Sequence, residues 1–346
     1  MESSKKAFIS IVLPCYNEEA ILSANFTIIR DFLESRDSKY TWEILIINDG
    51  SIDDTGIIAD EIEKTNHHVK VIHHPTNLNL GNALKTGFLN AKGEIIVVLD
   101  VDLSYSVENI EKLVDKLIEE SADIVMASPY MKGGKVTAVP FFRKIMSKWV
   151  NQFMRFSAQD KYYTFTGMVR AYRTSFIRSV NLKTKDYEIN PEIIYKAMIL
   201  RARIIEIPAH LDWTEQNKYT GKRTSSIRVI RGFFSGLMSA FIFRPYIFFM
   251  GIGAMLMCLS MYQLVWLLVD TITSWRDVLV QGIQTDYPFS YSLALQFKKN
   301  PQSFLVGGIT FLAAIQFLSL GFLSLQSKRY FEELFHLGTS LKKQKV

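Results

Sequence analysis

The chain has 346 residues, a formal net charge of +6 and a hydrophobic fraction of 48%. This length accommodates one large domain and a further element, and two cysteines are too few for a disulfide framework. Because the apolar residues concentrate in the C-terminal third, anionic lipid suits the positive charge better than nucleic acid, and we expect no nucleic-acid partner.

Apolar runs typical of buried strands alternate with segments of helical periodicity through the first part of the chain. The expected strands are 9–13, 44–48, 69–72, 95–100 and 124–127. The expected helices are 20–33, 55–64, 82–90 and 107–117. The alternation predicts an α/β fold with a doubly wound, Rossmann-like and mostly parallel sheet.

Polar residues gather in three loops that follow the first, second and fourth expected strands. These loops are residues 14–19, 48–54 and 100–102. In doubly wound sheets, ligands bind beyond the carboxyl ends of the strands. We therefore expect the three loops to converge on one binding site.

Asp100 and Asp102 follow the apolar run 95–99 and are separated by one residue. Period-2 geometry places both carboxylates on one side, where their repulsion favours a bound cation. Mg²⁺ or Mn²⁺ accepts such carboxylates and completes its shell with phosphate oxygens, which points to a nucleotide-diphosphate substrate. A solvated turn is the alternative. His73 and His74 end a strand and point to opposite faces, which argues against joint chelation.

Each remaining polar loop residue has a binding role and a simpler structural one. Asp49 accepts either the imide N–H of uracil or the N1–H and amino group of guanine, or it forms an Asx turn. Tyr16 stacks on a base or ribose, or is an ordinary half-buried aromatic. Glu18 begins a helix, where an acid also complements the macrodipole. Lys85 reaches a diphosphate or is a solvated helix lysine.

Two segments near the C-terminus, 245–269 and 303–326, contain no charged residue. Each exceeds the ~20 residues that a membrane-spanning helix needs, with buried core helices as the alternative. Lysine and arginine gather before the first and after the second segment, which orients both ends to the cytoplasm. We expect a multi-pass membrane protein with its large domain on the cytoplasmic face, an extracytoplasmic loop at 270–302 and a basic tail at 327–346.

Two further segments have the pattern of helices that lie on a membrane surface. Residues 141–157 place apolar and basic side chains at helical spacing, and residues 226–244 lead into the first span. For the first of them, packing on the sheet is the alternative interpretation.

The motifs together resemble glycosyltransferase family 2 with the GT-A fold, and within it the dolichyl-phosphate mannose synthase and polyprenyl-phosphate glucosyltransferase group. The matching blocks are 13–19, 48–51, 80–83, 99–104, 132–134 with 143–147, and 170–173. The resemblance implies that residues 1–225 form a GT-A glycosyltransferase domain.

The resemblance also implies donor-side roles. The residues implied to bind the nucleotide are Pro14, Tyr16, Glu18 and Asp49, with Lys85 added from its place in the chain. Asp100 and Asp102 match the metal–diphosphate site. Ser104 stands where the family often has glutamine, so this third metal ligand is expected to bind weakly or through water.

Acceptor-side roles follow in the same way. Arg143 and Ser147 match residues that hold the acceptor phosphate, and Arg143 joins the two aspartates as a catalytic residue. Lys132, Lys218 and Arg223 are expected to add positive charge. Glu192 matches an acidic position near the sugar, and it equally fits a first-turn acid after a proline.

The expected reaction is an inverting, metal-dependent transfer of a hexose from a nucleotide-diphosphate sugar to undecaprenyl or dolichyl phosphate. UDP-glucose is favoured by the two-span layout shared with bacterial glucosyltransferases. The alternatives are a GDP-mannose-dependent mannose synthase, a processive polysaccharide synthase and a non-enzymatic membrane adaptor. The expected partners are the nucleotide sugar, the polyprenyl phosphate and membrane lipid, and a homo-oligomer is compatible with the sequence.

Overall fold

The computed structural model describes residues 6–158, 162–214, 241, 245–281 and 286–343. The chain divides into two compact units. One unit comprises Met1–Ala240 and Glu332–Val346, and the other comprises Phe241–Phe331.

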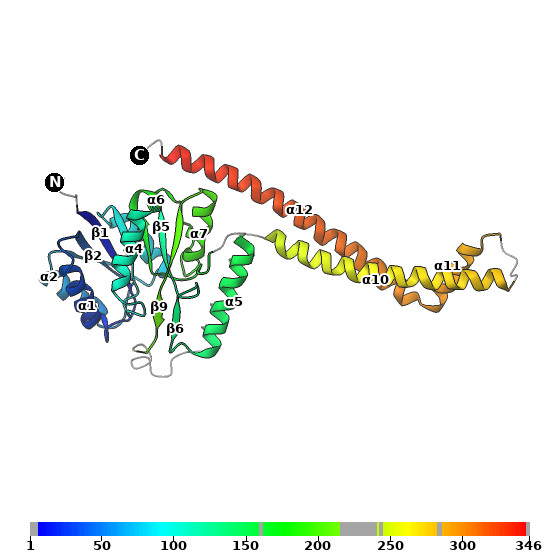
Figure 1. The fold of residues 1–346 in the computed structure, drawn as a ribbon, viewed down its shortest axis with the longest axis horizontal. Coiled ribbons are helices and arrows are strands. Elements are labelled where there is room, and N and C mark those ends of the chain that lie inside the picture. The colour runs from blue at the N-terminus through cyan, green and yellow to red at the C-terminus, as the bar shows by residue number, and fades with distance from the viewer. Residues whose placement is uncertain (1–5, 159–161, 215–240, 242–244, 282–285, 344–346) are drawn as a thin grey trace. The chain divides into compact units, whose positions relative to one another are not determined.

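A seven-stranded sheet lies at the centre of the first unit (Figure 1), in the order β3-β2-β1-β4-β7-β5-β8. Its strands are β1 (Ala7–Cys15), β2 (Tyr40–Asn48), β3 (Val69–His73), β4 (Ile95–Val98), β5 (Ile124–Ser128), β7 (Arg170–Arg173) and β8 (Ile204–Pro208). All neighbouring strands pair in parallel except β7, which is antiparallel to both β4 and β5. The mostly parallel α/β sheet predicted from the sequence is confirmed.

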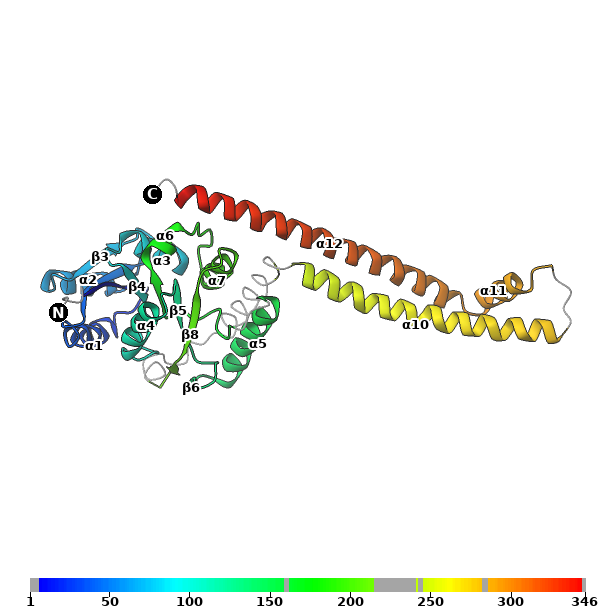
Figure 2. The ribbon, with the colours of Figure 1, turned by 45° about the horizontal axis from the view of Figure 1, so that its top comes forward.

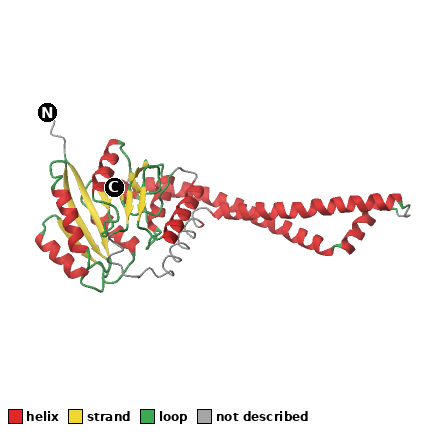
Figure 3. Cartoon of the chain, turned by 60° about the horizontal axis from the view of Figure 1, so that its bottom comes forward, coloured by secondary structure: helices red, strands yellow, loops and turns green. Residues whose placement is uncertain are grey.

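Helices cover both faces of this sheet (Figure 2, Figure 3). One face carries α1 (Leu22–Glu34), α2 (Thr55–Thr65) and α4 (Glu108–Glu119), and the other carries α3 (Leu80–Asn90), α6 (Thr174–Ser179) and α7 (Ile189–Ile199). Coverage on both faces explains why the strands read as continuous apolar runs. Each strand and helix expected between residues 9 and 127 is present, with ends shifted by a few residues.

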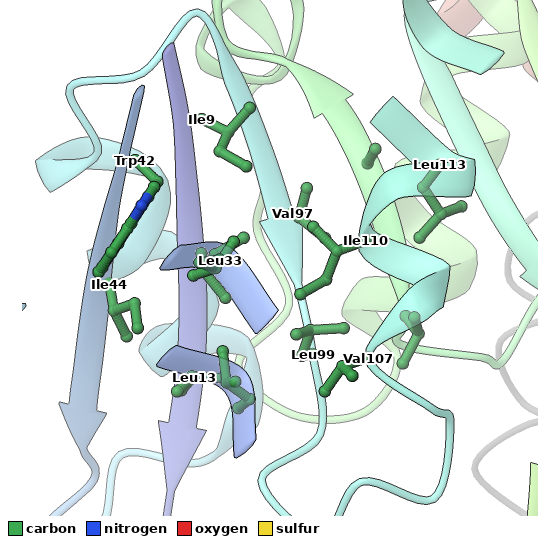
Figure 4. Close-up of a cluster of buried hydrophobic side chains, with 14 of the residues drawn as sticks. Ile9, Leu13, Leu33, Trp42, Ile44, Val97, Leu99, Val107, Ile110 and Leu113 are labelled. Carbon is green, nitrogen blue, oxygen red and sulfur yellow. The ribbon is translucent and has the colours of Figure 1, made fainter. Parts of the chain in front are cut away.

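The main core lies between the sheet and the helices α1, α2 and α4. Alternate residues of β1, such as Ile9 and Leu13, meet Leu33 of α1 and Ile110 of α4 (Figure 4). The opposite face of β1 is packed by α3, where Gly87 lies against Val12 so closely that an added Cβ would come within 2.4 Å of that side chain. These two layers fix the carboxyl ends of β1, β2 and β4 relative to one another.

Strand β4 ends at Val98, whereas the sequence predicted a strand as far as residue 100. Asp100 and Asp102 therefore lie in a turn that contains Leu103 with φ +50°. The strand prediction was wrong here because apolar character continues through Leu99 while the parallel pairing of β4 with β1 ends at Val98. The turn, and not strand alternation, places the two carboxylates.

The second unit contains two long apolar helices, α10 (Pro245–Val280) and α12 (Pro301–Lys343) as far as Phe331, with α11 (Pro288–Lys299) between them. The stretches Pro245–Val280 and Pro301–Gly338 are long and apolar enough to cross a membrane, with mean hydropathy 1.9. Within the unit, the Ser260 hydroxyl donates to the Gly307 carbonyl at 3.1 Å, and small residues let the helices approach closely.

These helices differ in extent from the sequence prediction. Helix α10 continues past residue 269, α11 lies in the predicted loop 270–302, and α12 continues as helix through the predicted tail as far as Lys343. The charge-free segments marked only the apolar centres, because a helix carries on into polar flanks wherever its backbone hydrogen bonds can continue. Of the predicted surface helix 226–244, only residue 241 lies among the described residues.

Candidate active site at the carboxyl ends of β1, β2 and β4

The loops that follow β1 and β2 are joined by hydrogen bonds. The Asn17 N–H donates to the Ser51 hydroxyl at 3.0 Å, and the Glu18 N–H donates to the Thr55 hydroxyl at 2.7 Å. Asn17 adopts φ +57°, a left-handed conformation that asparagine tolerates better than most residues. This local geometry turns the first loop toward the second.

The loop after β4 joins the other two. The side-chain amide of Asn25 in α1 donates to the Val101 carbonyl at 2.8 Å, which ties the aspartate turn to the first helix. Glu18 lies near enough that its pKa is raised to about 7 by burial and, after it, by the negative charge of Asp102. The convergence of the three polar loops, expected from the sequence, is confirmed.

Asp100 and Asp102 bring two carboxyl groups close together, and each disfavours the ionisation of the other. The pKa of Asp100 is raised to about 8, first by burial, then by Asp102 and then by Glu18. Asp102 accepts a hydrogen bond from the Ser104 N–H at 2.9 Å. The turn that the sequence offered as the alternative to a metal site is therefore also present. Such mutual repulsion is what a bound cation would relieve.

The same residues fit a magnesium or manganese ion that shares its shell with a substrate. Across the described part of the chain, no group of three His, Cys, Asp or Glu side chains is placed to hold a metal by itself. Mg²⁺ commonly takes only one or two protein carboxylates and completes its shell with phosphate oxygens and water. The pair Asp100 and Asp102 suits that arrangement, with Ser104 buried beside it.

The raised pKa of Asp100 has a consequence for stability. In the metal-free folded chain this carboxyl holds its proton up to about pH 8, whereas its ordinary pKa is 3.8. Between these values the folded state binds more protons than the unfolded state, so its contribution to stability falls as pH rises. With EDTA present, we expect the melting temperature to fall by a few degrees between pH 5.5 and pH 8.5, and Asp100→Asn to flatten that slope. An unchanged slope in the variant would contradict the assignment.

Asp49 is buried at the end of β2 and is held by the loop that follows β3. Its Oδ1 accepts hydrogen bonds from His74 Nδ1 at 2.6 Å and from the Leu78 N–H at 3.0 Å. The local side-chain-to-backbone hydrogen bond in this loop is made by Asn48 and not by Asp49, since Asn48 Oδ1 accepts from the Ser51 N–H. The Asx interpretation of Asp49 is therefore wrong.

The other residues expected at the nucleotide lie on the same edge of the sheet. Pro14 is in the last part of β1, opposite Ile47 of β2, and Tyr16 follows β1 with 43% of its surface exposed. An exposed ring at the rim of the three loops is available for stacking on a ligand. Tyr16 is therefore no core residue, and its role in binding stays a prediction.

Lys85 on α3 lies near several charged residues, and the sequence did not predict that they would be close to it. Its pKa is lowered, chiefly by burial, while Glu192 opposes that shift and Lys185 adds to it. Gly81 makes this approach possible, because an added Cβ would come within 2.6 Å of the Lys185 backbone. The solvated-lysine interpretation therefore does not describe Lys85, which is half-buried.

Glu192 is buried near the start of α7 and is engaged by the preceding loop. It accepts hydrogen bonds from the N–H groups of Lys183 at 2.8 Å and Thr184 at 3.0 Å, and it pairs with Lys196. Burial alone would raise its pKa, but the hydrogen bonds from Lys196 and Thr184 hold that pKa below its usual range. These contacts favour the structural, first-turn interpretation of Glu192.

Arg143 and Ser147 lie one turn apart on α5 (Phe141–Ala158) and share a cluster of aromatic residues. The Arg143 guanidinium stacks 4.2 Å from the centroid of the Trp213 ring, and Ser147 Oγ accepts from the Tyr130 hydroxyl at 2.8 Å. Lys132 is exposed in the loop that follows β5. Lys218 and Arg223 lie outside the described residues.

Helix α5 has one buried and one exposed face. Val150 and Met154 are buried, whereas Phe141 and Trp149 are 79% and 69% exposed and Ile145 lies between them on the same face. Large apolar side chains at i, i+4 and i+8 beside lysines are typical of a membrane-surface helix. The buried face of α5 fits the interpretation of a packed helix, and its exposed face fits that of a membrane-surface helix.

Four residues make contacts in this region that no signal in the sequence was strong enough to predict. Trp213 and Tyr130 come from distant parts of the chain, and His74 was considered only as a metal ligand. Buried Arg170 of β7, opposite Val98 at the end of β4, donates to the carbonyls of Asn190 at 2.9 Å and Phe165 at 2.7 Å. The expectation that His73 and His74 diverge is confirmed, since His73 contacts Asp60 and Asn48 instead.

Comparison with known proteins agrees with this site. Residues 10–181 match the family described as glycosyl transferase family 2. Dolichol-phosphate mannosyltransferase from Pyrococcus furiosus is 32% identical, over 58% of this chain and 55% of that enzyme. Polyprenol monophosphomannose synthase from Mycolicibacterium smegmatis is 30% identical, over 53% of this chain and 71% of that enzyme. Dolichyl-phosphate beta-glucosyltransferase from Trichomonas vaginalis is 27% identical, over 60% of this chain and 66% of that enzyme.

The sheet, its three loops and the paired aspartates define the class of this α/β unit as a GT-A glycosyltransferase domain. The chain belongs to glycosyltransferase family 2. It spans just over half the length of the Pyrococcus enzyme that it matches. The family match, residues 10–181, lies within the α/β unit, and the two apolar helices follow it in the chain.

Proposed function

We propose that this chain transfers a hexose from a nucleotide-diphosphate sugar to a polyprenyl phosphate, of the undecaprenyl or dolichyl type, and that UDP-glucose is the donor. The observation that carries the proposal is the convergence of Asp49, Glu18 and the pair Asp100 and Asp102 at one edge of the sheet. The relatives named above, which act on dolichyl or polyprenyl phosphate, support the acceptor class.

Asp100 and Asp102 would hold Mg²⁺ or Mn²⁺, with Ser104 as a weaker or water-mediated third ligand. When bound, the ion would supply positive charge to the diphosphate of the donor. Pro14, Tyr16, Glu18 and Asp49 would hold the nucleoside, and Lys85 would face the diphosphate.

The acceptor needs no general base. A phosphate monoester has a second pKa of ~6, so a polyprenyl phosphate is already a dianionic nucleophile at neutral pH. The protein must instead offset the repulsion between acceptor and donor phosphates. Arg143, Ser147 and Lys132 would do this, joined by Lys218 and Arg223 from outside the described residues.

Attack by the acceptor phosphate oxygen on the anomeric carbon would break the bond to the diphosphate in one displacement. The nucleoside diphosphate would leave from the opposite side, so the configuration at that carbon would invert. An α-linked donor would therefore give a β-linked lipid phosphosugar.

A lipid acceptor would also explain the rest of the chain. Helices α10 and α12 would cross the membrane, with the α/β unit on the cytoplasmic side. The exposed Phe141, Ile145 and Trp149 of α5 would rest in the headgroup region, beside the arginine that holds the acceptor phosphate. The reaction would then take place where the charged end of the lipid lies.

The test is transfer by the purified full chain in lipid nanodiscs that contain undecaprenyl phosphate. With Mn²⁺ and a panel of radiolabelled nucleotide sugars, we expect one labelled, lipid-extractable product carrying a single hexose, formed from UDP-glucose and abolished by EDTA. A product that grows with time would indicate a processive synthase. GDP-mannose as the only active donor would identify the mannosyl alternative that two of the relatives suggest. No transfer from any donor would contradict the proposal.

A further inference from the structure

Asp49 offers only one side of its carboxylate to a ligand. Oδ1 already accepts two hydrogen bonds, from His74 Nδ1 at 2.6 Å and from the Leu78 N–H at 3.0 Å. A carboxylate oxygen has two lone pairs, so Oδ1 is saturated. Among the described residues, both hydrogen bonds to the Asp49 carboxylate reach Oδ1, which leaves Oδ2 to a ligand.

His74 is held at both ring nitrogens. Nδ1 lies against Asp49, and Nε2 lies 2.9 Å from the hydroxyl of Thr86 on α3. With the proton on Nδ1, the ring donates to the carboxylate and accepts from Thr86, so both groups are satisfied in one neutral tautomer. The His74 and Asp49 side chains are only 8% and 6% exposed, so water cannot readily replace either contact.

Nucleobases differ in how many acceptor oxygens their edge requires. Uracil presents one donor, the N3–H, between two carbonyl oxygens. Guanine presents two donors side by side, N1–H and N2–H, which match both oxygens of a carboxylate in a bidentate pair. A carboxylate with one oxygen saturated satisfies uracil completely and leaves one guanine donor unpaired, and an unpaired buried donor is costly.

We propose that His74 is a positioning residue that occupies one oxygen of Asp49 and thereby selects a uridine over a guanosine nucleotide. This inference rests on the proposed function, because it assumes that Asp49 meets the base of the donor. It assigns the selectivity to the chain of contacts from Thr86 through His74 to Asp49, and not to Asp49 alone.

The experiment measures the affinities of UDP and GDP, each with Mn²⁺, for the full chain in detergent by calorimetry. We expect UDP to bind about tenfold more tightly or better, the effect of one hydrogen bond to a charged group. In His74→Leu the freed Oδ1 gains an acceptor position, so the UDP-to-GDP affinity ratio should fall by about tenfold. His74→Asn keeps a donor near the position of Nδ1 and should restore most of the ratio.

His73→Ala is the matched control, because His73 is the neighbouring histidine and pairs with Asp60 away from Asp49. It should leave the UDP-to-GDP affinity ratio unchanged. Melting temperatures identify any variant that fails to fold. Should His74→Leu fail to fold, Thr86→Val carries the test through a smaller fall in the ratio, while His74→Asn should stay near the parental value. GDP binding as tightly as UDP to the parent chain, or a ratio that His74→Leu leaves unchanged, would overturn the inference. Nucleotide binding is measured without acceptor, so a failure of sugar transfer would count against the proposed function only.

Discussion

Replacing Asp100 and Asp102 together by asparagine is expected to lower the rate of sugar transfer by about a thousandfold or more. Asparagine keeps the size of the side chain and removes both negative charges, so a divalent cation loses its protein ligands. The turn should persist, because an amide oxygen can still accept from the Ser104 N–H. The measurement is the initial rate of lipid-linked product, with Mn²⁺ binding followed by calorimetry in the presence of UDP.

A matched control comes from two partly exposed carboxylates of α4. Glu111 and Asp115 pair with Lys39, and their joint replacement by glutamine and asparagine also removes two negative charges. Exposed ion pairs contribute little, so this variant should keep parental transfer and lose about 1 kcal/mol of stability at most per pair. Parental activity in the Asp100→Asn, Asp102→Asn variant, with unchanged metal binding, would remove the basis of the proposed mechanism.

The strands that build the site were predictable because their chemistry is repetitive. A run such as 95–98 is apolar on both faces, and only a strand covered by helices on both sides accommodates that pattern. The position of the three loops then followed from topology alone, since parallel strands end at one edge of the sheet. The point at which β4 ends did not follow, because it depends on its pairing with β1 and on the turn at Leu103.

Strand β7 shows what periodicity cannot predict. Its sequence, Arg170 to Arg173, begins and ends with arginine, yet Arg170 is 1% exposed. The strand is central because its first charge is met by two backbone carbonyls, those of Asn190 and Phe165, which come from other segments. A buried arginine of this kind is stable only when such partners are in place, and their arrival is a property of the whole fold.

The contacts around Asp49 were unpredictable for a similar reason. The sequence identified Asp49 as a base-binding candidate, and the loop after β2 is where it lies. Its partners His74 and Leu78 follow a different strand, and the approach requires Gly50 at φ +67°, packed against the backbone of Thr76. The residue type identified Asp49 as a candidate for base binding. Only the three-dimensional contacts show how many of its carboxylate oxygens are left for a ligand.

Replacing Arg143 by glutamine is expected to lower kcat/KM for the polyprenyl phosphate by about a hundredfold, as removal of one preorganised charge commonly does. Glutamine keeps a polar side chain on α5 but cannot offset the acceptor phosphate. The affinity for UDP with Mn²⁺ should stay at the parental value, because the nucleotide is held by the loops after β1 and β2. Steady-state kinetics in nanodiscs of varied undecaprenyl phosphate content give the first quantity, and calorimetry gives the second.

Arg155 provides the matched control on the same helix. Like Arg143 it stacks on an aromatic ring, with its guanidinium 4.2 Å from the centroid of Tyr163, but it lies three turns further along α5. Arg155→Gln therefore removes the same charge and a similar stacking contact, worth about 0.5–1 kcal/mol at an exposed site, without reaching the acceptor phosphate. A loss specific to Arg143→Gln separates phosphate binding from the attraction of a basic helix to anionic lipid. Equal losses in both variants would assign the effect to membrane attachment and would leave Arg143 without a role in the reaction.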